Sequence, residues 1–183
     1  MRLGLFPTMV GIWTLGTKPE FDQKLYDDLL AVHASIKTEG GEIWSRQAHN
    51  IFDGTIACAK QLAGNALKLI QREFIGPNGR ITHLQGREVV RYAGTEIMPH
   101  SDEDECHLQA VYFPNGPELD PLLDLQEQVN QYGPNAFAIC NPDWRSSGFG
   151  KCLMPWETHA KYWIKPHRGL LVDFDARAVH FQK

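Results

Sequence analysis

The chain has 183 residues, of which 43% are hydrophobic, and this length fits one domain with its own core. Its net charge is −4 and its basic residues are scattered, which argues against a nucleic-acid binder because phosphate binding favours clustered Lys and Arg. No stretch approaches the roughly 18 uninterrupted apolar residues of a membrane helix. The first residues lack the apolar run of a signal peptide, and the 4 cysteines form no C-x-x-C pair, so we expect a cytoplasmic protein with reduced thiols.

The first 80 residues predict one strand and two helices. Residues 1–15 alternate loosely between apolar and polar types, which predicts a strand. At 20–37 apolar residues recur every three or four positions, and this spacing predicts an amphipathic helix. A second helix is predicted at 53–74, with Asp53 as its N-cap and a turn at 76–79 after it.

The rest of the chain is dominated by short β-like runs separated by Pro, Gly and Asn. The predicted strands lie at 88–92, 96–100, 107–113, 136–140, 161–164, 169–174 and 178–181, with a short helix at 119–131. The predicted fold class is therefore α+β, with two N-terminal helices flanking an antiparallel β sandwich or barrel. We expect a single domain over 1–183, mainly helical at 1–80 and with its β core at 81–183.

A candidate metal site begins with His100 and Asp102, which lie two positions apart at the end of a predicted strand. In an extended backbone residues i and i+2 point to the same face, so the imidazole and the carboxylate can reach one point. His180 follows the strand at 169–174 and a short turn, and a strand–turn–strand hairpin would bring it back into the same core. Two His and one carboxylate form a facial triad, which suits Fe(II) because three coordination positions stay open.

Other residues are candidates for competing or supporting roles. The rival ligands, which we weigh less, are His107, His159, His167 and Asp104. His107 lies at odd spacing from His100 and is therefore expected to face away. The acidic run at 102–105 is typical of a solvated edge. The polar connection at 141–148 is the kind of segment that carries binding residues, so Trp144 and Arg145 are predicted to contact substrate.

A longer pattern surrounds the three candidate ligands. It comprises Arg91-Tyr92-x-Gly94-x₅-His100-x-Asp102, the strand Val111-Tyr112-Phe113, and Gly169-Leu170-Leu171-Val172-x-Phe174 ahead of His180. This pattern resembles the 2-oxoglutarate/Fe(II)-dependent oxygenase superfamily, in particular its prolyl-hydroxylase-like members. The regions at 5–8 and 44–52 resemble a bacterial and phage branch of putative oxygenases. The resemblance implies a double-stranded β-helix, or jelly roll, as the β core.

The resemblance also implies a role for individual residues. His100, Asp102 and His180 are expected to bind Fe(II). Tyr92 and Tyr112 match positions that line the 2-oxoglutarate pocket, where a phenol can hydrogen-bond a carboxylate. The implied activity is hydroxylation of an unactivated C–H bond in a small molecule or a peptide side chain, with 2-oxoglutarate and O₂ as cosubstrates.

One feature departs from the family pattern. Family members usually carry an Arg about ten residues beyond the distal His, on the final core strand, and it binds the distal carboxylate of 2-oxoglutarate. The sequence ends at Lys183, so that strand and its Arg are expected to be missing from it, and three explanations stay open: the chain is truncated, another basic residue replaces the Arg, or the cosubstrate differs. The unranked candidates are Arg91, Arg145, Lys165, Arg168 and Arg177. A sheet edge exposed in this way can pair with a second copy, so a homo-oligomer is a further expectation.

Two other interpretations stay open. A cupin-like metalloenzyme would use the same ligands without 2-oxoglutarate, and succinate release coupled to turnover separates it from the first interpretation. A non-catalytic jelly-roll module, such as a binding or virion-associated protein, would not contain stoichiometric iron. The sequence does not identify the substrate.

Overall fold

The computed structural model describes residues 2–5, 8–37, 50–90, 96–102, 106–118, 135–140 and 161–182. The chain divides into two compact units. Met1–Thr14 and Ala93–Lys183 form the first, which we call the sheet unit, and Leu15–Tyr92 form the second, the helical unit. The expectation of one domain with a flank at 1–80 stays a prediction. Neither of the described α-helices combines the length and the apolar character of a membrane span.

The helical unit contains α1 (Pro19–Lys37), α2 (Ala57–Ile70) and a π-helical turn, η1 (Gln71–Ile75). Both predicted helices are therefore confirmed. Proline suits the first position of a helix because its missing N–H would have no partner there. The acidic first turn of α1 opposes the positive end of the helix dipole, and its buried Asp22 accepts a hydrogen bond from Thr17 Oγ1 at 2.8 Å. The turn predicted after the second helix is present at 77–78.

Two local predictions in the helical unit were wrong. Asp53 is not an N-cap, because α2 begins only at Ala57 and the Asp53 carboxylate instead accepts a hydrogen bond from the Thr55 N–H at 2.7 Å. Such a local side-chain bond holds a turn and delays the helix start. The strand predicted at 88–92 is absent over its described part, 88–90, where the buried carboxylate of Glu88 lies 4.0 Å from the imidazole of His33.

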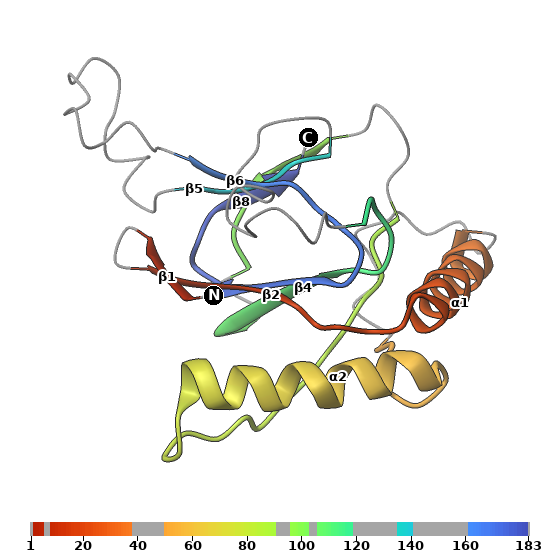
Figure 1. The fold of residues 1–183 in the computed structure, drawn as a ribbon, viewed down its shortest axis with the longest axis horizontal. Helices are drawn as coiled ribbons and strands as arrows, with labels where there is room; N and C mark the ends of the chain where they lie inside the picture. The colour runs from red at the N-terminus through yellow and green to blue at the C-terminus, as the bar shows by residue number, and fades with distance from the viewer. Residues whose placement is uncertain are drawn as a thin grey trace. The chain divides into compact units, whose positions relative to one another are not determined.

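Within its described residues, the sheet unit contains eight strands in two antiparallel sheets (Figure 1). The strands are β1 (Arg2–Leu5), β2 (Thr8–Thr14), β3 (Ile97–His100), β4 (Leu108–Phe113), β5 (Phe137–Cys140), β6 (Lys161–Ile164), β7 (Leu170–Asp175) and β8 (His180–Gln182). Sheet A has the order β1-β2-β7-β4 and sheet B the order β3-β8-β5-β6. These elements confirm six of the seven strands predicted after residue 80, while the helix predicted at 119–131 lies outside the described residues. The start of the chain is β-structure as predicted, but it forms two paired strands, β1 and β2, rather than one.

The last six strands pair in a nested order. The innermost pair is β5 with β6, the next is β4 with β7, and the outermost is β3 with β8. The chain crosses from one sheet to the other between β6 and β7 and again between β7 and β8. The expectation that β7 and β8 form a paired hairpin was therefore wrong. The turn between them, closed by a 2.9 Å bond from the Ala178 N–H to the Asp175 carbonyl, carries the chain out of sheet A into sheet B.

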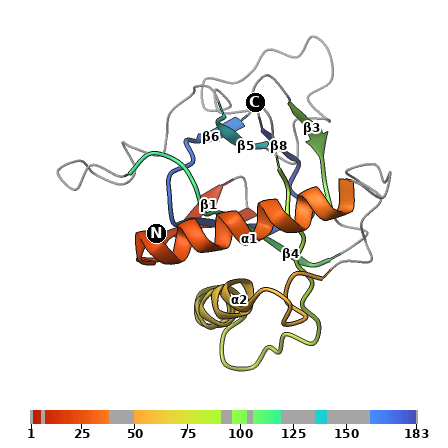
Figure 2. The ribbon, with the colours of Figure 1, turned by 90° about the vertical axis from the view of Figure 1, so that its right-hand side faces the viewer.

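The two sheets of the sheet unit form separate layers (Figure 2), and its hydrophobic core lies between them. Val172 of β7 is flanked in register by Ile12 of β2 and Val111 of β4, so these side chains share the inner face of sheet A. The ring of Phe137, from sheet B, lies 5.8 Å from that of Phe174, from sheet A. Side chains of the two inner faces meet in this way in β-sandwiches. The metal-ligand candidates lie beside this core.

Candidate metal centre

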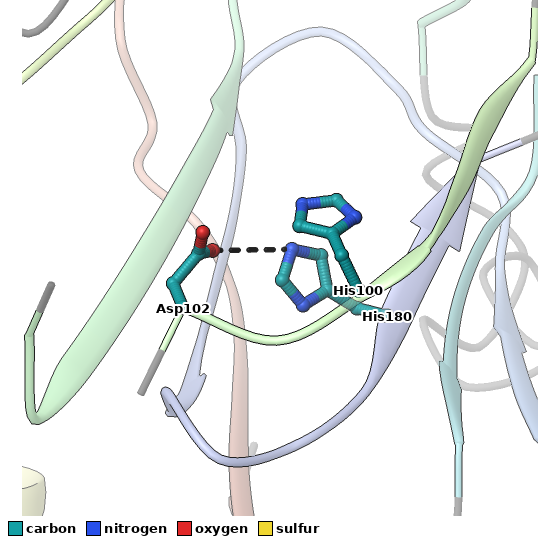
Figure 3. Close-up of side chains that lie close together, drawn as sticks. All are labelled: His100, Asp102 and His180. Atoms are coloured by element: carbon teal, nitrogen blue, oxygen red, sulfur yellow. Dashed lines mark ion pairs between the residues drawn. The ribbon is translucent and has the colours of Figure 1, made fainter. Parts of the chain in front are cut away.

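Three side chains that are far apart in the sequence meet in the sheet unit (Figure 3). His100, Asp102 and His180 each offer a ligand atom, and the three atoms lie within 4.8 Å of one another. The Nε2 atom of His180 is 3.5 Å from Asp102 Oδ2, and the centroids of the two imidazole rings are 4.3 Å apart. Within the described parts of the chain, this is the one group of three such residues close enough to hold a metal ion.

His100 owes its position to an irregularity in β3. Ile97 pairs with Gln182 and His100 with His180, so three steps along β3 match two along β8. This extra residue makes a β-bulge, a device that re-aims a side chain and is frequent beside active sites. Pro99 lies inside the bulge and has no N–H to give to a ladder. The sequence therefore interrupts the regular pairing of β3 with β8 just before the candidate ligand His100.

Asp102 is fixed by the same turn that leads to His180. Its N–H donates to the carbonyl of Ala176 at 3.0 Å, and the Ala176 N–H donates to the carbonyl of His107 at 3.1 Å. The turn is further stabilised by Arg177, which binds the Asp175 carboxylate through Nε at 2.9 Å and through Nη2 at 2.5 Å. The two halves of the site therefore share one backbone support.

Both histidines have a backbone carbonyl as the partner of Nδ1. Nδ1 of His100 lies 2.8 Å from the Met98 carbonyl, and Nδ1 of His180 lies 3.1 Å from the Ala178 carbonyl. A carbonyl can only accept, so each Nδ1 carries the hydrogen of the bond, and in the neutral imidazole Nε2 then carries the lone pair. Metal-binding histidines typically use their second nitrogen in this way, since it fixes the tautomer and the ring plane. Sequence reasoning did not identify these acceptors, although both lie two residues before their histidine.

The surroundings of the site favour a bound cation. Asp102 is 8% exposed and His180 is 3% exposed, while His100 is half-buried. The rings of Phe174 and Phe137 lie 4.9 and 5.7 Å from that of His180. A buried carboxylate such as that of Asp102 is costly unless a positive charge balances it, and a divalent ion would do so.

The spacing of the donors fits a first-row metal ion. Protein nitrogen and oxygen atoms lie about 2.1 Å from such an ion. One ion could therefore bind both His180 Nε2 and Asp102 Oδ2, because their 3.5 Å separation is shorter than two such bonds. The three candidate atoms lie within 4.8 Å of one another, and three protein ligands would leave further positions open on the ion.

Among the described residues of the sheet unit, His167 is the other deeply buried histidine, and it belongs to a different environment. Its Nε2 atom lies 3.0 Å from Thr14 Oγ1. Burial lowers the pKa of His167 to about 4, so its imidazole is neutral at physiological pH. His167 is not part of the metal-ligand group, in agreement with the sequence analysis, which favoured it less than His180 as a ligand.

The other predicted site residues lie away from the triad or outside the described residues. Val111 and Phe113 contact the core, so Tyr112 between them lies on the opposite face of sheet A. Arg177 pairs with Asp175 and Arg168 with Glu118, whereas Lys165 is exposed. The remaining predicted residues, all outside the described parts, are Arg91, Tyr92, Asp104, Trp144, Arg145 and His159.

Comparison of the chain with protein-family models, with curated proteins and with solved structures finds no match. The site is therefore interpreted from its own chemistry. That chemistry comprises two imidazoles with fixed tautomers and one buried carboxylate, on two strands and a shared turn.

Proposed function

We propose that this chain is a mononuclear non-haem Fe(II) oxygenase. The observation that carries the proposal is the convergence of His100, Asp102 and His180, with the Nδ1 atom of each histidine bound to a backbone carbonyl. Two imidazoles and one carboxylate are the ligand set of the Fe(II) facial triad. Fe(II) held by these three residues would supply open coordination positions for O₂ and a cosubstrate. The protein positions the reactants and excludes water.

The strand order supports a jelly roll as the scaffold. Two four-stranded antiparallel sheets, with the last six strands in nested pairs, have the arrangement expected of a β ribbon wound into two layers. In the proposed fold, His100 lies at the end of one outer strand and His180 at the start of its partner. The ligands therefore come from paired strands.

The proposed reaction is hydroxylation of a C–H bond in a small molecule or a peptide side chain. Phe174 and Phe137 cover the ring of His180 and keep water from that side of the site. The shared turn keeps Asp102 and His180 at a fixed separation. A 2-oxo acid is the proposed cosubstrate, and 2-oxoglutarate, the acid that the family resemblance implies, is the first to test.

The test is an anaerobic titration of the full chain with Fe(II) and then with 2-oxoglutarate. A chelated 2-oxo acid on Fe(II) gives a weak absorption band in the green, and we expect this band in the wild-type chain. His180→Ala should abolish it. His167→Ala is the matched control, since it removes an equally buried histidine outside the triad, and it should retain the band. Iron binding without a band would contradict the use of 2-oxoglutarate, and equal iron binding by His180→Ala would contradict the metal site.

A metalloenzyme that does not use 2-oxoglutarate is the second candidate. The observation in its favour is that Arg177 and Arg168 are already paired with carboxylates. A free carboxylate ligand would have to compete with these pairs, because bidentate binding by Arg is strong. Succinate formed in step with O₂ consumption would exclude this candidate.

A further inference from the structure

Tyr162 belongs to the row of side chains that contains the two histidine ligands. Across sheet B, His100 pairs with His180, His180 with Ile139, and Ile139 with Tyr162. Paired residues of neighbouring strands lie on the same face. Ile139 belongs to the core, and Tyr162 packs against that core. The tyrosine therefore points into the space between the sheets, two strands from His180.

Gln109 enters the same space from sheet A. It lies two positions before Val111 on β4, and Val111 packs against the core, so the two side chains share the inner face. In register Gln109 pairs with Phe174, whose ring lies 4.9 Å from that of His180. The side chain of Gln109 therefore starts from the backbone position paired with Phe174, whose ring contacts the metal-ligand candidate His180.

Each of these side chains carries a buried polar atom. Among the described residues, Tyr162 Oη and Gln109 Oε1 are inaccessible to solvent and have no hydrogen-bond partner. Buried polar groups in native proteins are nearly always satisfied, so such an atom points to a bound water, ion or ligand. Burial raises the pKa of Tyr162, so its hydroxyl remains protonated and can donate a hydrogen bond.

We propose that Tyr162 and Gln109 bind the uncharged polar end, a carboxamide or a hydroxyl, of a small 2-oxo acid whose other end coordinates the metal. A phenol that donates and an amide oxygen that accepts suit a group with both an acceptor and a donor. A second carboxylate would be less well matched, because it has no hydrogen to give to Gln109 Oε1. This inference rests on the metal centre proposed above and names the ligand of that centre.

The test compares three probes that share the 2-oxo acid end. 2-Oxoglutaramate ends in a carboxamide, 2-oxoglutarate in a carboxylate, and 5-methyl-2-oxohexanoate in an alkyl group of similar shape. Their affinities are measured anaerobically on the full chain loaded with Co(II). The carboxamide should bind about tenfold more tightly than the alkyl analogue, the effect of roughly one well-made hydrogen bond. It should also bind more tightly than the carboxylate.

Variants assign the preference to the two residues. Tyr162→Phe and Gln109→Leu should each reduce the preference for the carboxamide to less than about threefold, with Co(II) affinity unchanged. Tyr112→Phe, on the opposite face of sheet A, is the matched control and should retain it. If the carboxylate binds most tightly, or if Tyr162→Phe and Gln109→Leu both keep the preference, the inference is wrong although the metal centre stands. If the wild-type chain does not bind Co(II), both proposals fail together.

Discussion

His180 and His167 are buried to the same extent in the same unit, each with 3% exposure, yet their surroundings differ. Around His180 lie a carboxylate and a second imidazole, at distances suited to a shared ion. His167 meets the hydroxyl of Thr14. Burial of a histidine therefore does not identify a metal ligand. The groups that its two ring nitrogens face decide the role.

The difference has a simple electrostatic origin. Burial without a nearby carboxylate disfavours the imidazolium ion, so His167 stays neutral and a hydroxyl suffices as its partner. At His180, one nitrogen already donates to a carbonyl and the other lies 3.5 Å from Asp102. A cation between these groups is stabilised by both. The predictions below test whether the two regions behave as a metal site and a structural site.

The largest expected effect is the loss of metal binding in Asp102→Ala. Removing the one anionic ligand should lower the affinity for Fe(II) or Co(II) by more than about 100-fold, because even residues that only support a ligand contribute up to roughly that much. Calorimetric titration measures the change. Glu118→Gln is the matched control, since Glu118 is a carboxylate of the same unit that pairs with Arg168 outside the ligand group, and it should bind metal like the wild type. Equal metal affinities for Asp102→Ala and the wild type would mean that the region of His180 is not a metal site and does not differ in this way from the region of His167.

His167 should make the free energy of unfolding depend on pH. Its folded-state pKa of about 4 lies below the unfolded value of 6.5, so the unfolded chain binds more protons between these values. The stabilisation is complete above pH 6.5 and is lost as the pH falls towards 4, by about 3 kcal/mol in total. Denaturant unfolding at several pH values measures it. The slope in this window should be smaller in His167→Gln, and an unchanged slope would show that His167 is not the group responsible.

Pro99→Ala tests the bulge in β3. Alanine restores an N–H that can enter the ladder with β8, so the bulge becomes less favoured and His100 less well aimed. We expect metal affinity to fall by about tenfold, in the range found for changes in the support of a ligand. The fold should persist, as far-ultraviolet circular dichroism can verify. Wild-type affinity in this variant would mean that the bulge does not position His100.

The smallest effect is expected for Thr14→Val. This change keeps the shape of the side chain and removes the hydroxyl that lies 3.0 Å from His167 Nε2. The free energy of unfolding should fall by about 1 kcal/mol at neutral pH, the usual contribution of one hydrogen bond. Metal affinity should be unchanged. A loss of metal affinity in Thr14→Val would mean that the region of His167 and the metal-ligand group are coupled, whereas we treat them as independent.

The sequence predicted the features that depend on local periodicity. Apolar spacing located both helices, and short β-like runs located the described strands, because backbone geometry sets these patterns. The interval of two residues between His100 and Asp102 correctly placed their side chains together. Each of these inferences needed only a few neighbouring residues.

The features that sequence reasoning missed depend on non-local pairing. The turn after β7 looks like a hairpin in the sequence, but its two strands pair in different sheets. Tyr112 matches a family position, yet a shift of one residue along a strand reverses the face, and the core contacts of Val111 place it on the outer side. The inward direction of Tyr162 became evident only from its pairing across β5 with His180.

The most direct test of the central claim is the metal content of the purified chain after anaerobic equilibration with Fe(II), measured for the wild type, His180→Ala and His167→Ala. We predict one iron per chain for the wild type and for His167→Ala. His180→Ala should retain almost none at the same free Fe(II) concentration. Iron that is absent from the wild type, or retained equally by all three chains, would contradict the metal centre of His100, Asp102 and His180.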